Sequence, residues 1–200
     1  MDALSTISQL IVSQHKEWTE IVTDFETRNQ YTVFDESGEK LYLAAEDSGS
    51  TLTRMFLKAA RPFKISILKP DGSTAIRIER PFRFFFHRID VLDNQGNCIG
   101  SVEKKFSFLR RIYSVFNKAG KETYQLHGPI LKPWTFEIRR QGVKYGKITK
   151  KWSGLLKETF SDADNFGVEL PSNWDTEKKA VFLGAVFLID FVHFEDKSND

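Results

Sequence analysis

The stretch Ala180-Val-Phe-Leu-Gly-Ala-Val-Phe-Leu-Ile-Asp-Phe-Val-His-Phe194 decides the fold, because a helix formed from it is apolar on every side. Such a helix must lie inside protein or inside lipid. Its fifteen residues reach only about 22 Å, short of the roughly 30 Å of a bilayer's hydrocarbon core. Asp190 would also cost a few kcal/mol in a lipid-facing position. The stretch therefore predicts a core helix and not a membrane span.

The predicted helix covers about residues 176–193. Asp175, Thr176 and Glu177 suit its N-terminus, since such residues cap backbone N–H groups and complement the helix dipole. The central-helix side chains that we expect to matter for function are Phe182, Leu183, Val186, Phe187, Ile189 and Asp190.

Upstream of this helix, turn sequences with a glycine recur between short apolar runs, at Gly38, Gly72, Gly96, Gly120 and Gly142. A turn of this kind between two alternating apolar segments is typical of a β-hairpin. Five hairpins give ten strands, and residues 155–160 and 166–170 add two more. Such strands form a barrel or a sandwich, and a barrel leaves no exposed edge. The sequence predicts a mainly β protein, a barrel of about twelve antiparallel strands that encloses the hydrophobic C-terminal helix.

Apolar residues near the N-terminus follow one face of a helix. They recur from Leu4 and Ile7 to Val22 and Phe25, with polar side chains between them. This spacing predicts an amphipathic helix over about residues 5–22 that docks on the barrel. The predicted organisation is an N-terminal helix and lead-in over 1–28, a barrel domain over 29–195 and a polar tail over 196–200.

The charge of the chain is unevenly spread, although its net value is only +2. Residues 101–151 hold 13 basic and 3 acidic side chains, whereas residues 152–200 hold 4 basic and 10 acidic ones. A basic stretch of this size indicates an anionic partner, either a phospholipid surface or a nucleic acid. The alternative is a solvated face that the acidic C-terminal part balances in space.

The sequence argues against several kinds of chemistry. Cys98 is the only cysteine, so no intrachain disulfide is possible and a reducing compartment fits. The first ten residues lack a charged segment followed by an apolar run, so we expect no secretory signal. No motif typical of a hydrolase, a nucleotide-binding loop or a metal site is present, and the four histidines are scattered. We therefore expect no bond-making catalysis.

A series of short motifs occurs in order between residues 4 and 195. They are Asp24-Phe-Glu-Thr27 with Asn29 and Tyr31, Ala44-Ala-Glu-Asp47, Arg61-Pro-Phe63, Glu79-Arg-Pro81, Gly146-Lys-Ile-Thr-Lys-Lys-Trp152, Phe160-Ser-Asp-Ala-Asp-Asn-Phe-Gly-Val-Glu-Leu-Pro171 and Lys179-Ala-Val-Phe-Leu-Gly-Ala-Val-Phe-Leu-Ile-Asp-Phe191. In order and spacing this series resembles the phospholipid scramblase family, within the tubby-like and LURP-one-related superfamily. The resemblance implies twelve strands around one buried helix, which agrees with the count from the hairpins.

The family is associated with calcium-triggered, energy-independent movement of phospholipids between membrane leaflets. The resemblance also implies a twelve-residue calcium loop, with ligand positions at Asp162, Asp164, Phe166, Val168, Leu170 and Asn173. Phe166 offers only its backbone carbonyl, and Asn173 stands where a bidentate acid is usual. We therefore expect weak Ca²⁺ binding, on the order of 10⁻⁴–10⁻³ M. The alternative is an Asx-rich turn between two strands.

A second group of residues is expected to contact the membrane. Family members often carry an acylated cysteine cluster after Glu79-Arg-Pro81, but here that place reads Phe82-Arg-Phe-Phe-Phe-His-Arg88. S-acylation at this place is excluded, so any anchoring there must be non-covalent. The expected contacts are Phe84, Phe86, Lys104, Lys105, Arg110, Arg111, Lys132, Arg139 and Arg140. For the Phe run, packing into the barrel core is the competing interpretation.

These observations favour a phospholipid scramblase at the cytoplasmic face of a membrane, with an anionic phospholipid surface as its partner and Ca²⁺ as its cofactor. The path of the lipid headgroup stays open: the helix leaves the barrel, several copies self-associate, or the barrel perturbs lipid packing from the surface. One alternative function is a peripheral module that binds phospholipids or phosphoinositides without transport. Nucleic-acid binding through the same basic residues comes last, since no base-reading motif is present.

Overall fold

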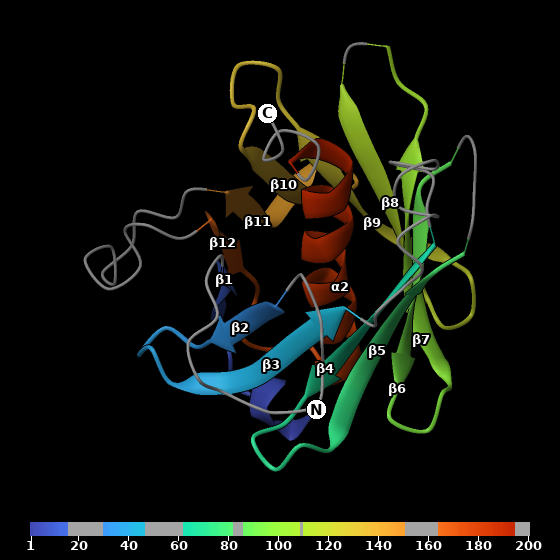
Figure 1. Cartoon of the computed structure of the whole chain (residues 1–200). Helices are drawn as coiled ribbons and strands as arrows, with labels where there is room; N and C mark the ends of the chain where they lie inside the picture. Colours follow the sequence, from blue (N-terminus) through green and yellow to red (C-terminus); the bar gives the residue numbers. More distant parts are fainter. Residues whose placement is uncertain (16–29, 47–61, 82–85, 109, 151–163, 195–200) are drawn as a thin grey trace.

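Twelve antiparallel strands close into a barrel around one helix in the computed structural model of the chain (Figure 1). The strands are β1 Gln9–His15, β2 Gln30–Phe34, β3 Lys40–Glu46, β4 Phe63–Leu68, β5 Thr74–Arg80, β6 Arg88–Asp93, β7 Cys98–Lys105, β8 Arg111–Asn117, β9 Glu122–Gly128, β10 Thr135–Arg140, β11 Val143–Lys150 and β12 Asp164–Glu169. A short 3-10 helix, η1 Asp2–Leu4, precedes them, and the central helix α2 Thr176–His193 follows. The structure describes residues 1–15, 30–46, 62–81, 86–108, 110–150 and 164–194. The predicted mainly β architecture is confirmed.

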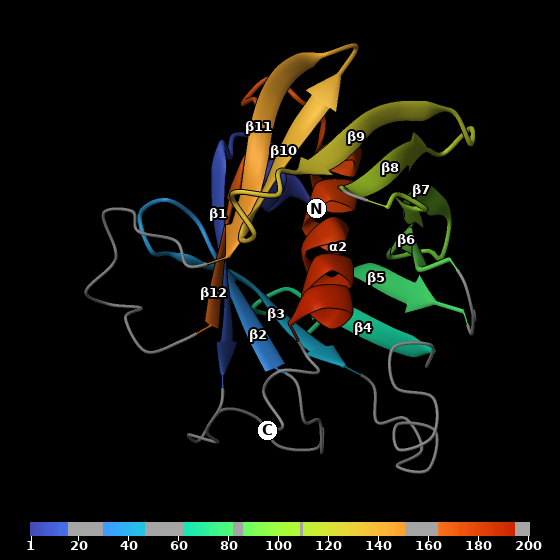
Figure 2. The same ribbon diagram turned by 90° about the horizontal axis from the view of Figure 1, so that it is seen from above.

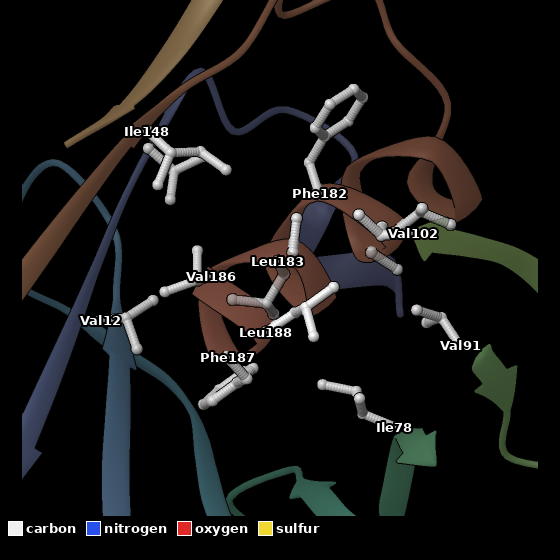
Figure 3. Packing of buried hydrophobic residues seen from close by; sticks show 14 of the residues in the cluster. Val12, Ile78, Val91, Val102, Ile148, Phe182, Leu183, Val186, Phe187 and Leu188 are labelled. Atoms are coloured by element: carbon white, nitrogen blue, oxygen red, sulfur yellow. The ribbon is translucent and has the colours of Figure 1, made fainter. Parts of the chain in front are cut away.

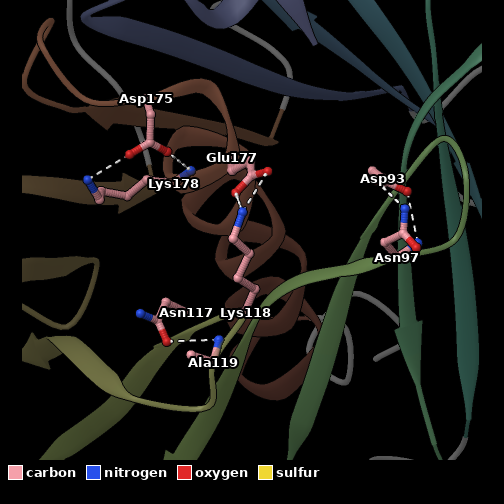
Figure 4. Close-up of polar contacts among 8 residues, drawn as sticks. All are labelled: Asp93, Asn97, Asn117, Lys118, Ala119, Asp175, Glu177 and Lys178. Atoms are coloured by element: carbon pink, nitrogen blue, oxygen red, sulfur yellow. Dashed lines mark hydrogen bonds and ion pairs between the residues drawn. The ribbon is translucent and has the colours of Figure 1, made fainter.

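Five tight hairpins join the strands from β2 to β11 in pairs, as the turn glycines predicted. In all five turns the glycine has a positive φ, for example 81° at Gly72, and glycine tolerates this conformation because it lacks a Cβ. Turn Asp and Asn side chains accept backbone N–H groups. Asp93 accepts from Gln95 and Asn97, and Asn117 accepts from Ala119. Figure 4 shows Asp93 with Asn97 and Asn117 with Ala119. Local sequence therefore fixes these five strand pairs.

The N-terminal helix predicted over residues 5–22 is wrong, because residues 9–15 form strand β1. This strand pairs with β12 on one side and with β2 on the other, and so closes the barrel. The consecutive apolar residues Leu10, Ile11 and Val12 fit a strand buried in the wall, and two sheet edges in need of a partner outweigh the local helical spacing. Residues 16–22 of that prediction, like the strand predicted over 155–160, lie outside the described residues. The twelfth described strand is thus β1.

Helix α2 runs through the barrel, and every residue from Lys179 to Phe191 is buried. Asp175 caps it, since its carboxylate accepts the backbone N–H of Lys178 at 2.7 Å. Figure 2 shows the strands surrounding the helix. The barrel wall therefore supplies an apolar partner in every direction, which explains why no side of the helix is polar. In the described part of the chain, no helix meets the length and hydropathy of a membrane span.

The two ends of the barrel differ in their connections. Because consecutive strands are antiparallel neighbours, the five tight hairpins lie at one end, and the connections from β5 to β6, from β7 to β8 and from β9 to β10 lie at the other. Helix α2 starts at the hairpin end and finishes at the second end (Figure 1). We call the second end the loop rim, defined by the described residues 86–87, 106–108, 110 and 129–134.

Gly184 lies where α2 packs closely against β6, so we predict that Gly184→Ala destabilises the protein. A Cβ there would lie 2.7 Å from Val91 Cγ2 and 3.3 Å from Ile89 Cδ1. Overpacking should cost about 1–3 kcal/mol and exceed the roughly 1 kcal/mol by which alanine favours a helix. Urea unfolding measures the difference. Gly184→Ala should cost less stability in a Val91→Ala background than in the parent, because Val91→Ala removes the methyl group that the new Cβ meets. A Gly184→Ala protein as stable as the parent would contradict this packing.

Candidate functional site

The predicted central-helix residues all lie in the barrel core. Phe182, Leu183, Val186, Phe187, Ile189 and Asp190 are each at most 5% exposed. Figure 3 shows Val186 directed toward Val12 on the barrel wall. Aromatic contacts add to this packing, since the ring of Phe187 meets that of Tyr31 edge-on at 5.0 Å. The helix is therefore the core that the barrel needs.

Asp190 is held by a buried ion pair and a hydrogen bond. The Nζ of Lys150, on β11, lies 3.3 Å from Asp190 Oδ1, and both side chains are only 7% exposed. The hydroxyl of Tyr31, on β2, donates to Asp190 Oδ2 at 2.9 Å. Lys150 Nζ also lies 4.3 Å from the ring centre of Phe194. Strands from two parts of the wall thus fix the C-terminal half of α2.

Lys179 fixes the other end of α2. Its fully buried ammonium group donates to three backbone carbonyls, those of Leu4 at 3.0 Å, Ser5 at 2.8 Å and Ser172 at 2.9 Å. An ammonium group has three donors, so these bonds satisfy it completely. Burial lowers the pKa of Lys179. This lysine ties the N-terminal segment to the start of the helix.

His87 connects the loop rim to the core. Its Nδ1 lies 2.5 Å from Arg80 Nη2, so the neutral ring accepts a hydrogen bond from the guanidinium group. The same guanidinium lies over the ring of Phe191 on α2, at 4.4 Å from its centre. Burial, together with the positive charges of Arg80 and Lys104, lowers the pKa of His87 to about 4. His87 is therefore neutral at physiological pH.

The basic residues predicted to contact a membrane fall into two groups. Lys104, Lys105, Arg110, Arg111 and Lys132 lie at or next to the loop rim, whereas Arg139 and Arg140 lie near the hairpin end of β10. Lys105 is already paired with Glu122 on β9, at 2.8 Å. The structure therefore brings only part of the predicted set together.

Arg111 has a structural role that its sequence context does not show. Its guanidinium group donates to the backbone carbonyls of Pro129, Lys132 and Pro133, and it stacks over the ring of Phe136 at 4.7 Å. It thereby joins the start of β8 to the β9–β10 connection. The donors of Arg111 are thus used inside the protein. Arg110 and Lys132, which are exposed, are the more accessible cations of the rim.

The sequence reasoning missed the exposed apolar side chains of the rim. Phe106 and Phe108 are 84% and 92% exposed, and Ile130 and Leu131 are 64% and 94% exposed. Phe86, which was predicted, is 48% exposed, and Phe84 lies outside the described residues. The missed signal was Pro129-Ile-Leu-Lys132, a turn with no Gly, Asn, Asp or Ser at its centre.

A groove of about 460 Å³ lies on the outside of the barrel between β9 and β10. These strands pair at only three positions, because they diverge toward the hairpin end. Lys121, His127, Arg139 and Arg140 line the groove, together with Glu122 and neighbouring polar residues. Burial lowers the pKa of His127, and Arg139 and Arg110 lower it further. The groove therefore holds more cationic than anionic side chains.

The predicted calcium ligands lie in and around strand β12. Residues Asp164–Glu169 form this strand, which pairs with β1 and β11, and the side chains of Phe166 and Val168 face the core. Backbone carbonyls in such a strand take part in the sheet ladders, and Asp162 lies outside the described residues. Among the described residues, no group of three or more His, Cys, Asp or Glu side chains could hold a metal. These residues do not by themselves form a calcium loop, and Ca²⁺ binding here stays a prediction.

Comparison with known proteins gives a consistent result. A family model described as Scramblase matches residues 1–196. The chain is 34% identical to phospholipid scramblase 2 of Bos taurus and 34% identical to phospholipid scramblase 1 of Homo sapiens, each over 98% of this chain. It spans 71% and 65% of the length of these two relatives. An X-ray structure of a protein from Arabidopsis thaliana has a TM-score of 0.49 at 12% identity, over 98% of this chain and 95% of that one.

Removing one partner of the buried pair should destabilise the protein strongly. We predict that Lys150→Met or Asp190→Asn lowers the free energy of unfolding by about 3–5 kcal/mol, since each leaves a buried polar or charged group uncompensated. The double variant Lys150→Met/Asp190→Leu should recover most of this loss. Lys147→Met, which removes a partly exposed pair with Glu169, is the control and should cost less than about 1 kcal/mol. Urea unfolding measures these free energies. If Lys150→Met and Asp190→Asn each cost no more stability than Lys147→Met, the buried pair does not hold α2.

Proposed function

This chain belongs to the scramblase family, and we propose that it moves phospholipids between the leaflets of a membrane, without an energy source, as an intact barrel that keeps α2 inside. Family membership supports the lipid substrate. The proposal that α2 stays inside the barrel rests on one observation: every residue of the helix from Lys179 to Phe191 is buried. The proposed activity makes and breaks no covalent bond.

The alternative in which α2 leaves the barrel is disfavoured by its polar anchors. Exit would expose Lys179 and Asp190, which are fully partnered inside, and would place them in or beside hydrocarbon. It would also remove the apolar core that the inward faces of the strands require. We therefore propose that the barrel acts on lipid packing from the membrane surface.

The cytoplasmic face of a membrane is the proposed place of action. Anionic phospholipids are concentrated on this face, and the accessible cations Arg110 and Lys132 fit such a surface. Cys98, the only cysteine, fits a reducing compartment. The proposal includes activation by calcium through Asp162 and Asp164. Contact of the barrel with the membrane surface does not require the ion.

A disulfide between α2 and β6 tests whether the barrel stays closed during lipid movement. Because a Cβ at Gly184 would lie 2.7 Å from a methyl carbon of Val91, cysteines at both positions can bridge the two elements. We expect Gly184→Cys/Val91→Cys, made in a Cys98→Ser background, to scramble at a similar rate when oxidised and when reduced. Dithionite quenching of fluorescent lipids in liposomes measures the rate, with a leakage control and with Ca²⁺ titrated from zero upward.

Each result of this assay has a distinct meaning. Scrambling that is lost on oxidation and restored by reduction would show that α2 must move out. Quenching that stops at the outer leaflet in both states, and in the parent protein with and without Ca²⁺, would refute transport. A rate that rises with Ca²⁺ and loses this response in Asp162→Asn/Asp164→Asn would support the calcium loop.

A second candidate function is the binding of anionic lipid headgroups without transport, and the groove between β9 and β10 favours it. Lys121, Arg139, Arg140 and His127 gather there with few acidic neighbours, namely Glu122 and, beside Arg139, Glu137. A phosphorylated headgroup would be stabilised by these groups. Binding would raise the pKa of His127, so affinity should increase as the pH falls toward and below 6.5, its ordinary value.

Charge reversal tests the groove. We expect Lys121→Glu/Arg140→Glu to weaken binding to vesicles that contain phosphoinositides by about ten-fold or more, since two attractive charges become repulsive. Lys40→Glu/Lys69→Glu, placed on other hairpins, is the charge-matched control and should bind nearly as well as the parent. Equal losses in both variants would assign the effect to net charge. Gel shifts with single- and double-stranded nucleic acid at low salt test the nucleic-acid alternative in the same proteins.

A further inference from the structure

The turns at the two ends of the barrel have opposite chemistry. At the hairpin end, polar Asx-type turns surround Asp35, Asp71, Asp93 and Asn117. At the loop rim, the β9–β10 connection makes a turn of the same size, closed by a hydrogen bond from Lys132 N to Pro129 O at 3.2 Å, with Ile130 and Leu131 at its tip. Turn tips normally carry polar residues because they face water. The tip of this rim turn is therefore apolar, where a turn that faces only water would normally be polar.

Exposed apolar side chains are concentrated at this end. Among the described residues, eight large apolar side chains are exposed, and six of them belong to the rim connections: Phe86, Phe106, Phe108, Ile130, Leu131 and Trp134. The other two, Val143 and Tyr145, lie on β11 near the hairpin end. Scattered exposed apolar residues are ordinary, but a cluster on neighbouring turns marks an interaction surface. Four of the six are more than 60% exposed.

Two connections carry the most exposed apolar side chains, residues 106–110 between β7 and β8 and residues 129–134 between β9 and β10, and they are held close to each other. They extend from β8 and β9, which pair directly through Arg111 and Gly128. The guanidinium group of Arg111 donates to three carbonyls of the β9–β10 connection. At the base of the same connection, the ring of Trp134 stacks on Phe194 at 5.3 Å. The tips are thus presented on a rigid base, which lowers the ordering cost of binding.

The connections that define the loop rim carry charge of one sign. The connections over residues 81–87, 106–110 and 129–134 contain no Asp or Glu, and Arg110 and Lys132 sit beside the apolar tips. The apolar side chains lie in connections between strands, and four of them are more than 60% exposed. A second copy of the chain would bring like charges together across a two-fold interface, which disfavours self-association here. Projecting apolar side chains flanked by cations complement the interface of an anionic bilayer.

We propose that Phe106, Phe108, Ile130 and Leu131 insert into the interface of an anionic phospholipid bilayer, with Arg110 and Lys132 against the lipid headgroups. The inference rests on the proposed function, because it gives the lipid-moving barrel the surface by which it meets its substrate. The bilayer then contacts the end of the barrel where α2 finishes, and the polar hairpin end points away from it.

Replacing the four apolar residues tests the insertion. We expect Phe106→Ser/Phe108→Ser/Ile130→Ser/Leu131→Ser to bind vesicles of phosphatidylcholine and phosphatidylserine about ten-fold or more weakly than the parent in a flotation assay. The four side chains are exposed, so thermal unfolding should be almost unchanged. Val143→Ser removes an exposed apolar side chain at the other end and is the control. Its binding should equal that of the parent.

A fluorophore reports the depth of the rim directly. Attached at Phe108→Cys in a Cys98→Ser background, it should be quenched by lipids brominated on their acyl chains, whereas the same fluorophore at Val143→Cys should not. Arg110→Glu/Lys132→Glu should remove most of the dependence of binding on phosphatidylserine.

The outcomes separate this inference from the proposed function. Parent-like vesicle binding by the four-residue variant, or no binding by the parent, would overturn the insertion, whatever the scrambling rate. A four-residue variant that binds vesicles like the parent but has a different oligomeric state in sedimentation would also overturn the insertion, in favour of self-association. Vesicle binding that depends on the rim, in a protein that moves no lipid, would support the insertion and refute transport.

Discussion

The structure depends on one constraint: a helix without a polar side can exist in this protein only if every polar group it carries finds a partner inside the barrel. Asp190 meets Lys150 and Tyr31, and Lys179 meets three backbone carbonyls. The partners come from four separate parts of the chain, so the polar contacts specify how far α2 enters the barrel and how it is rotated. These contacts add to the close packing of α2 on the wall, which is apolar all round.

The sequence predicts most of this fold because most of it is encoded locally. A glycine turn between alternating apolar runs is enough to define a hairpin, and the central helix has the capping residue Asp175 together with a long apolar run. Strand β1 was misassigned because its identity is not local. Leu10, Ile11 and Val12 satisfy a helical as well as an extended pattern, and only the open edges of β2 and β12, far away in the sequence, require a strand there.

The candidate site was less accessible to sequence reasoning for a related reason. The basic stretch is visible in the composition, but which cations face outward depends on contacts across the fold. Arg110 and Arg111 are adjacent, yet Arg111 spends its donors on the β9–β10 connection. Phe108 and Phe136 are both phenylalanines in a predicted barrel, yet one is 92% and the other 1% exposed. Their difference follows from strand register and from the end of the barrel at which a turn lies.

The direction of α2 links the anchor to the surface. Because the helix starts at the hairpin end, Asp190, its partner Lys150 and the Trp134–Phe194 stack all lie close to the loop rim. A force on the rim turns therefore reaches the core through packed side chains and the buried ion pair, both of which resist displacement. The β9–β10 connection is therefore tied both to β8, through Arg111, and to the end of α2, through the Trp134–Phe194 stack. In the proposed surface mechanism, apolar side chains inserted at the rim would disorder the headgroup layer around them, and this disorder would lower the barrier to a headgroup entering hydrocarbon. The same anchors that disfavour the exit of α2 thus make the surface mechanism physically coherent.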